Sequence, residues 1–130
     1  MASKKETKKK LQKKEVSSGK IYISASFNNT IVTVTDNSGK TLNWSSSGHS
    51  GFKGTRKSTP FAATTAVEKV LSKTRSENGI SEVDVFVKGP GPGRDASLRA
   101  IRASGIKIRM IADTTPIPHN GPRPKKKRRA

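Results

Sequence analysis

The chain has 130 residues and carries 27 Lys or Arg against nine Asp or Glu, which gives a net charge of +18. That length accommodates one domain with tails, and that charge in a small protein is typical of a nucleic-acid partner. The sequence has no cysteine, which excludes disulfides and thiolate zinc sites, and no apolar run approaches the roughly 20 residues that span a bilayer, so we expect no membrane partner.

The positive charge is spread over three segments of the chain. Residues 1–18 hold seven Lys and two Glu, residues 19–115 hold fourteen basic and seven acidic residues, and residues 116–130 hold six basic residues and no acid. The run 4–14 has one Leu and no hydrophobic period, so we expect it to stay disordered until it is bound. We therefore predict a basic N-terminal extension (1–18), a single α/β domain that binds nucleic acid (19–115) and a basic, Pro-rich C-terminal extension (116–130).

Three short strands are predicted at the start of the domain. In Lys20–Ser26, apolar and polar residues alternate with period two, as in a half-buried strand, and β-branched residues fill Thr30–Thr35. A third strand is predicted over Thr41–Ser46. Asn28-Asn29 makes the first turn, because Asn tolerates positive φ and can bond its own backbone, and Asp36–Gly39 makes the second. Two short turns between three strands predict an antiparallel meander.

The regular pattern stops from Ser47 to Ser58, and a helix follows it. Thr59 or Ser58 can cap this helix, Pro60 fits its first turn, and Asn78-Gly79 ends it. Its apolar residues fall on one face, which is the face we expect in the core: Ala63, Ala66, Val67, Val70 and Leu71.

Two more strands and a second helix complete the domain. Ser81–Lys88 alternates valines with other residues and predicts a fourth strand. The loop Gly89–Gly93 leads to a short helix that we expect to begin at an Asp95 N-cap and to end at Gly105, before a fifth strand over Ile106–Ile111. The order βββαβαβ, with right-handed parallel crossovers, predicts an α/β fold in which a five-stranded mixed sheet carries helices.

The stretch Gly48–Lys57 has the chemistry of a phosphate-binding loop. It combines three Gly with Lys53, Arg56 and Lys57 just before a helix N-terminus, where free N–H groups and the helix dipole favour anions. A flexible solvated loop is the alternative interpretation. In a chain of this charge we expect contact with RNA or DNA phosphates.

The segment Lys88–Arg94 has only a superficial likeness to nucleotide-binding loops. A Walker loop requires Gly-Lys followed by Ser or Thr, and here Arg94 and Asp95 follow the last Gly. In a dinucleotide fingerprint the third Gly would come one residue later, and Asp113 only loosely fits the acid that should follow about 20 residues on. The two prolines here also remove N–H donors that a pyrophosphate would use. We expect a rigid turn that presents Lys88 and Arg94 to a nucleic-acid backbone.

Few residues suggest catalysis or metal binding. His49 and His119 lie in irregular segments without sequence neighbours that would form a triad or a metal site. The acids of the domain are scattered, although the partners in an active site meet in space and not in sequence. Asp36, Glu68 and Asp113 are the set that we would test for a metal ion, but we expect neither a metal nor another cofactor.

The last fifteen residues, Pro116–Ala130, contain four prolines and six basic residues. They cannot bury enough apolar surface to fold alone, so we expect them to become ordered only against a polyanion. Within them, Asn120-Gly121 is chemically reactive, because Gly leaves the following amide nitrogen unhindered for attack on the Asn side chain. We expect partial conversion of Asn120 to isoaspartate.

Four segments, in this order, give the chain a family resemblance: Ala25–Thr30, Gly51–Ala63, Val87–Arg94 and Thr115–Gly121. Over about residues 19–129 the chain is similar to small-subunit ribosomal protein eleven in its bacterial form. The resemblance implies a ribonuclease H-like fold without nuclease activity. It also implies a cytoplasmic, ribosomal location on the platform of the small subunit, bound to small-subunit rRNA near the mRNA exit region and the rRNA 3′ end. The implied protein neighbours are ribosomal proteins seven, eighteen and, where present, twenty-one.

The same resemblance implies which residues contact rRNA. They lie in the Asn-Asn turn, the two Gly-rich loops and the C-terminal extension: Asn28, Asn29, Lys53, Arg56, Lys57, Lys88, Arg94, His119, Asn120, Arg123, Lys125, Lys126, Lys127, Arg128 and Arg129. Pro122 departs from the bacterial pattern, which commonly has Cys after Asn-Gly. Because Pro removes an N–H donor and stiffens the backbone, this change affects the local shape of the extension.

Two other classes of function compete with a structural ribosomal protein. The mixed sheet could serve a nuclease, for which acids at the strand ends must converge within metal-bridging distance. A nuclear DNA-binding factor is the second alternative, because Pro124–Arg129 resembles a nuclear import signal.

Overall fold

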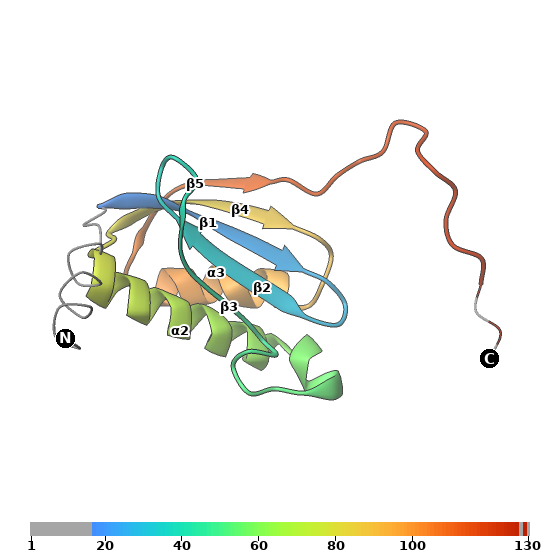
Figure 1. Cartoon of the computed structure of the whole chain (residues 1–130), viewed down its shortest axis with the longest axis horizontal. Helices are drawn as coiled ribbons and strands as arrows, with labels where there is room; N and C mark the ends of the chain where they lie inside the picture. Colours follow the sequence, from blue (N-terminus) through green and yellow to red (C-terminus); the bar gives the residue numbers. More distant parts are fainter. Residues whose placement is uncertain (1–16, 128, 130) are drawn as a thin grey trace, which may run out of the picture.

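Five strands form one mixed sheet that carries two helices on one face (Figure 1). The computed structural model describes residues 17–127 and 129, so nearly all of the predicted N-terminal extension lies outside the described residues, as does Arg128. The elements are β1 (Ser18–Ala25), β2 (Thr30–Thr35), β3 (Thr41–Ser46), the short 3-10 helix η1 (Gly54–Ser58), α2 (Pro60–Asn78), β4 (Glu82–Lys88), α3 (Gly93–Ala103) and β5 (Lys107–Asp113). The predicted order βββαβαβ is confirmed, and η1 is an addition to it.

The strands lie in the order β3-β2-β1-β4-β5, with β1 in the centre. β1 is antiparallel to β2 and parallel to β4; β2 is antiparallel to β3, and β4 is parallel to β5. The predicted meander of the first three strands is therefore confirmed. Both α-helices connect strands that run in the same direction, so β1, β3, β4 and β5 all end at the same side of the domain.

The core lies between the helices and one face of the sheet. Alternate residues of the central strands point into it, as the period-two patterns predict. The largest fully buried apolar side chains are Ile21, Ile23, Val32, Val34, Val67, Leu71, Val83, Val85, Val87 and Ile101. The opposite face of the sheet carries Tyr22 and Trp44, which are 39% and 56% exposed. No helix between residues 17 and 127 is long and apolar enough to cross a membrane.

α2 begins and ends where the sequence predicts. The Thr59 hydroxyl oxygen accepts a hydrogen bond from the Ala62 N–H at 3.3 Å, and Pro60 occupies the first turn, where an N–H would have no helical partner. At the other end Gly79 adopts a left-handed φ of 67° and donates its N–H to the Arg75 carbonyl at 3.0 Å. Local capping therefore determines this helix at both ends.

The predicted N-cap of the second helix is wrong. α3 begins at Gly93, directly after Pro92, and Asp95 lies within its first turn. A carboxylate there still stabilises the helix through its dipole. The N-cap is Pro92, whose fixed φ of −66° is already helical, so the helix begins without a side-chain cap.

Strand ends differ from the prediction by one or two residues, since partner strands set them. β1 begins at Ser18, which pairs with Glu82 of β4, and β5 extends to Asp113, which pairs with Val87. At its other end β1 stops at Ala25. These pairs join residues distant in sequence, and a local pattern contains no information about them.

Candidate nucleic-acid interface

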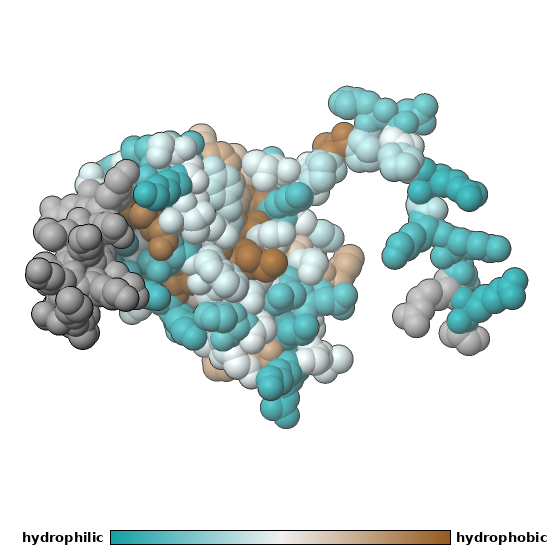
Figure 2. Space-filling model, in the orientation of Figure 1, coloured by the Kyte–Doolittle hydropathy of each residue, from teal (hydrophilic) through white to brown (hydrophobic). Residues whose placement is uncertain are grey.

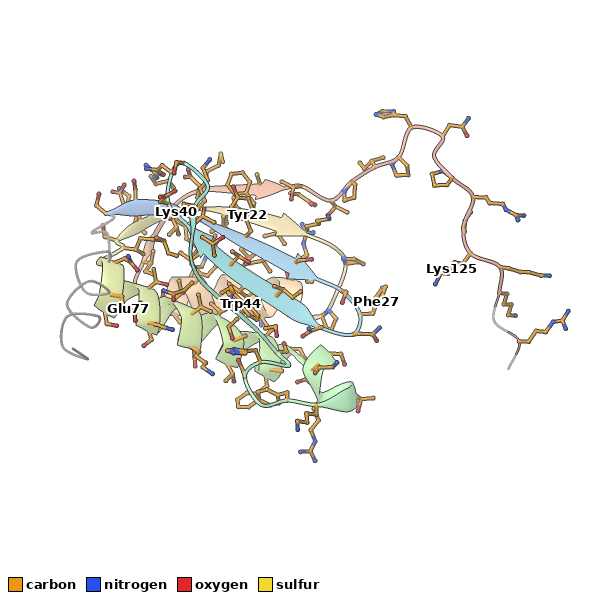
Figure 3. The ribbon with its side chains drawn as sticks, in the orientation of Figure 1. Tyr22, Phe27, Lys40, Trp44, Glu77 and Lys125 are labelled. Atoms are coloured by element: carbon orange, nitrogen blue, oxygen red, sulfur yellow. The ribbon has the colours of Figure 1, made fainter. Side chains whose placement is uncertain are left out.

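The four segments that carry the family resemblance meet at one end of the sheet. β1, β3, β4 and β5 all finish there, and the β1–β2 turn, the loop 47–58, the loop 89–92 and the C-terminal arm (residues 114–129) all start from it (Figure 1). We call this region the carboxyl end of the sheet. In Figure 3, Phe27 lies at the tip of this end and Lys40 at the opposite end. Topology thus places segments up to ninety residues apart on one surface.

The β1–β2 turn is held by its own polar groups. The Ser26 N–H donates to the Asn29 carbonyl and the Thr30 N–H donates to the Asn29 side-chain oxygen, both at 2.9 Å. The predicted turn is confirmed, but its predicted reason is only half right, since neither Asn has a positive φ; among the described residues other than Gly, only Asn120 does. The turn leaves the Asn28 side chain exposed beside Phe27.

The loop 47–58 is anchored to the domain at its start. Ser47 is fully buried, and its N–H donates to the Thr30 carbonyl at 3.0 Å, while the Phe52 N–H donates to the Ser47 carbonyl at 3.3 Å. Lys53 and Arg56 are exposed, and Arg56 belongs to η1. A flexible solvated loop is therefore the weaker interpretation of this segment.

The N-terminus of α2 does not offer its amides in the way that the sequence indicates. Thr59 already accepts the Ala62 N–H, and Pro60 has none. An anion at this loop would depend mainly on the basic side chains. They lie beside a surface hollow of about 440 Å³ lined by Ser50, Gly51, Phe52, Lys53 and Arg56.

The glycines of the segment Lys88–Arg94 have a packing role. A Cβ on Gly89 would lie 2.2 Å from the Ala25 carbonyl oxygen, and one on Gly91 would lie 2.1 Å from that of Ser26. On Gly93 it would lie 2.0 Å from the Thr30 hydroxyl oxygen. These glycines therefore let the loop lie against the β1–β2 turn. Lys88, at the end of β4, remains exposed.

Arg94 lies in a network at the base of the arm. Its guanidinium donates to the Asp113 carboxylate at 2.8 Å and to the Gly89 carbonyl at 3.3 Å. The other Asp113 oxygen accepts the Thr115 N–H at 3.0 Å and the Thr115 hydroxyl at 2.6 Å. The bonds from Arg94 and Thr115 hold the pKa of Asp113 well below its usual range, and the bond to Asp113 raises the pKa of Arg94. We call Gly89, Arg94, Asp113 and Thr115 the arm-base cluster.

The arm itself extends away from the domain (Figure 1). Every described residue from Pro116 onward is exposed, and Figure 2 shows a largely hydrophilic segment beyond its base. Lys125 lies far from the sheet in Figure 3. Asn120 has a φ of 57°, so the backbone turns at the Asn-Gly pair. His119, Arg123 and Lys125–Lys127 are thus exposed to a partner.

The acids that we would test for a metal ion do not come together. Asp36 follows β2, which runs opposite to β5, so it lies at the other end of the sheet from Asp113. Its carboxylate accepts the N–H groups of Ser38 and Lys40, both at 2.9 Å. Within the described part of the chain, no three His, Cys, Asp or Glu residues are grouped to hold a metal ion. Asp36 and Asp113 therefore cannot share one metal ion.

Exposed aromatic side chains are the part of the surface that the sequence reasoning missed. Phe27 and Phe61 are 71% and 70% exposed at the carboxyl end of the sheet, and Phe61 packs edge-on against Phe52 at 5.8 Å between ring centroids. On the open face of the sheet, Tyr22 stacks on Phe86 at 5.1 Å. Their positions in the sequence could have indicated this exposure, because Phe27 follows a predicted strand and Phe61 lies in the first turn of a predicted helix.

Comparisons with known proteins identify the family of this chain. Residues 19–129 match the family described as Ribosomal protein S11. The small ribosomal subunit protein uS11 of Nitratidesulfovibrio vulgaris is 55% identical over 129 residues, which cover 99% of each chain. That of Alteromonas mediterranea is 57% identical over 121 residues, which cover 93% of this chain and 92% of the relative. The matched residues include all four segments that meet at the carboxyl end of the sheet, and the chain belongs to the ribosomal protein S11 family.

Proposed function

We propose that this chain is a structural protein of the small ribosomal subunit that binds small-subunit rRNA through the carboxyl end of its sheet and its C-terminal arm. The relatives are small-subunit proteins by name, and the net charge of +18 suits a polyanionic partner. The observation that carries the proposal is the convergence of the β1–β2 turn, both Gly-rich loops and the arm on one surface. The role is not catalytic.

The proposed contacts are those implied by the resemblance. The cationic residues would bind phosphates, and Asn28, Asn29, His119 and Asn120 would fit the shape of the RNA through hydrogen bonds. The cations are Lys53, Arg56, Lys57, Lys88, Arg94, Arg123, Lys125, Lys126, Lys127, Arg128 and Arg129. Phe27 is added to this set, since an exposed aromatic ring beside an Asn turn can stack on an unpaired base.

The finer assignment also rests on the family. We propose a basic extension (1–18), an RNA-binding domain of ribonuclease H-like fold (19–115) and a second basic extension (116–130). The location would be the platform of the small subunit, in the cytoplasm, near the mRNA exit region and the rRNA 3′ end. Ribosomal proteins seven, eighteen and twenty-one would be the neighbours.

The test is the salt dependence of binding to small-subunit rRNA by the full chain. Changing four arm residues to Gln removes four phosphate contacts, and each contributes about 0.7–0.9 to the slope of log affinity against log salt. The slope should therefore fall by roughly three. The four residues are Arg123, Lys125, Lys126 and Lys127.

A matched variant removes the same charge elsewhere on the domain, by changing Lys40, Lys69, Lys73 and Lys107 to Gln. It should change the slope much less, because these residues lie away from the carboxyl end of the sheet. Equal effects of the two variants would mean that binding follows net charge and not this surface. Failure of the unaltered chain to bind the rRNA, or to sediment with small subunits at moderate salt, would refute the proposed function.

A further inference from the structure

Two acids lie in the region where the proposed RNA-binding cations gather: Asp95 in the first turn of α3 and Asp113 at the end of β5. A carboxylate beside a bound polyanion opposes binding by charge repulsion. Asp113 is nevertheless 54% exposed at the base of the arm. An acid at this place is expected to have a role that outweighs its repulsion of the RNA.

The arm-base cluster connects three segments through the Asp113 carboxylate. One oxygen accepts from Arg94, which also donates to the Gly89 carbonyl, and the other accepts from both donors of Thr115. The Thr115 hydroxyl in turn accepts the Gly89 N–H at 3.1 Å. The loop before α3, the start of α3 and the first residues of the arm are therefore held together around one acid.

Proline carries this orientation outward. Thr115 precedes Pro116, which restricts Thr115 to extended conformations, and Pro116 and Pro118 each fix their own φ. Ile117, between these two prolines, lines a hollow of about 500 Å³ against Pro90. A direction set at Thr115 therefore persists toward the Asn-Gly pair.

We propose that Asp113 is a positioning residue for RNA binding: by holding Arg94 and Thr115 it fixes the direction in which the C-terminal arm leaves the domain. This inference rests on the proposed function. It gives Arg94 a role in the arm-base cluster that comes before its proposed role as a phosphate contact. A prearranged arm loses less conformational freedom when it binds, so affinity rises without a new contact.

For Asp113→Asn, the proposal and simple electrostatics predict opposite changes in the affinity for RNA. Removing a negative charge next to a polyanion should tighten binding, whereas releasing the arm should weaken it. For the full chain and small-subunit rRNA we expect Asp113→Asn to weaken binding on the order of fivefold to tenfold. Asp95→Asn removes the same charge from a neighbouring position outside the cluster, and it should leave the affinity unchanged or raise it slightly.

Combination with the arm variant separates positioning from general damage. In the full chain whose Arg123, Lys125, Lys126 and Lys127 are Gln, the arm has little to position, so Asp113→Asn should no longer weaken binding. Equal weakening in both backgrounds would overturn the proposal, as would unchanged or tighter binding by the single variant. If the unaltered chain fails to bind the rRNA, the proposed function fails instead.

A second variant tests the same proposal if Asp113→Asn does not fold. Arg94→Lys keeps the charge but replaces the planar guanidinium, whose two terminal nitrogens reach Gly89 and Asp113 separately, with a single compact ammonium that lacks this fork geometry, so it should also weaken binding. Arm direction is measurable without RNA, because the chain has no cysteine and Ile117→Cys accepts a single spin label. In NMR spectra the label should selectively broaden the amide signals of residues around Pro90 and Arg94. When Arg94 is Lys, the broadening should no longer be confined to these residues. Unchanged affinity and broadening in Arg94→Lys would refute the positioning role.

Discussion

Replacing Gly91 with Ala tests whether the Lys88–Arg94 segment packs against the β1–β2 turn. The new Cβ would lie 2.1 Å from the Ser26 carbonyl oxygen, whereas ordinary contacts lie at 3.4–4 Å, so two backbone segments would have to separate by more than an ångström. Gly91 is not among the glycines with positive φ, so the strain would be steric and not conformational. The separation would also weaken the bond from the Gly91 N–H to the Ala25 carbonyl, which is 2.9 Å long.

Overpacking costs about 1–3 kcal/mol and a lost hydrogen bond about 0.5–1.5 kcal/mol, so Gly91→Ala should lower the free energy of unfolding by roughly 2–4 kcal/mol. For a domain of this size that corresponds to a fall in Tm of roughly 8–16 °C. Thermal unfolding followed by circular dichroism measures it. Gly48→Ala is the matched control, since its Cβ would be tightly placed only against the flexible Lys57 side chain, at 3.2 Å, and would lie at ordinary contact distances from Ser46 and Phe52. Equal Tm values for the two variants would refute the packing argument.

Three further predictions concern single residues. Thr59→Ala removes the N-cap of α2 and should lower the free energy of unfolding by about 0.5–2 kcal/mol, whereas Thr59→Ser keeps the hydroxyl and should keep the stability. Urea denaturation measures the difference, and equal stability of the unaltered chain and both variants would contradict the cap. The folded-state pKa of Asp113 is depressed, so its stabilising contribution should be complete above its ordinary pKa of about 3.9 and lost as the pH falls below that value. The difference in urea midpoint between the unaltered chain and Asp113→Asn should accordingly be larger at pH 7 than at pH 3, and a difference that grew toward acid would contradict the Arg94 pair. Asn120, exposed and followed by Gly121, should convert partly to isoaspartate during storage; peptide mass spectrometry should detect the product, and Asn120→Gln should abolish it.

Local patterns predicted those parts of the fold that local physics determines. Period-two alternation identified β1 and β4, and the Thr59 cap with Gly79 bounded α2 within a residue. Pairing between distant segments decided the remainder. The ends of β1 and β5 are set by pairing with their parallel partner β4. α3 begins directly after Pro92 and not at the predicted Asp95.

The candidate interface was predictable in its residues but not in its arrangement. Charge and motifs indicated Lys53, Lys88 and the arm, whereas the sheet order that gathers them is a property of the whole chain. The bond between Arg94 and Asp113 joins residues nineteen apart and has no sequence signature. For the same reason, scattered acids could not reveal that Asp36 and Asp113 lie at opposite ends of the sheet.

The contact between the two motifs Ala25–Thr30 and Val87–Arg94 has a consequence for how this chain can vary. A Cβ added to Gly89, Gly91 or Gly93 would overlap an atom of the other motif, so no room remains between the two segments. The atoms opposite Gly89 and Gly91 are the backbone carbonyl oxygens of Ala25 and Ser26, which are present whatever side chains these two positions carry. Substitution of Gly89 or Gly91 should therefore fail whatever residues occupy Ala25–Thr30, whereas at Gly93 a larger residue would require smaller side chains at positions 30 and 63.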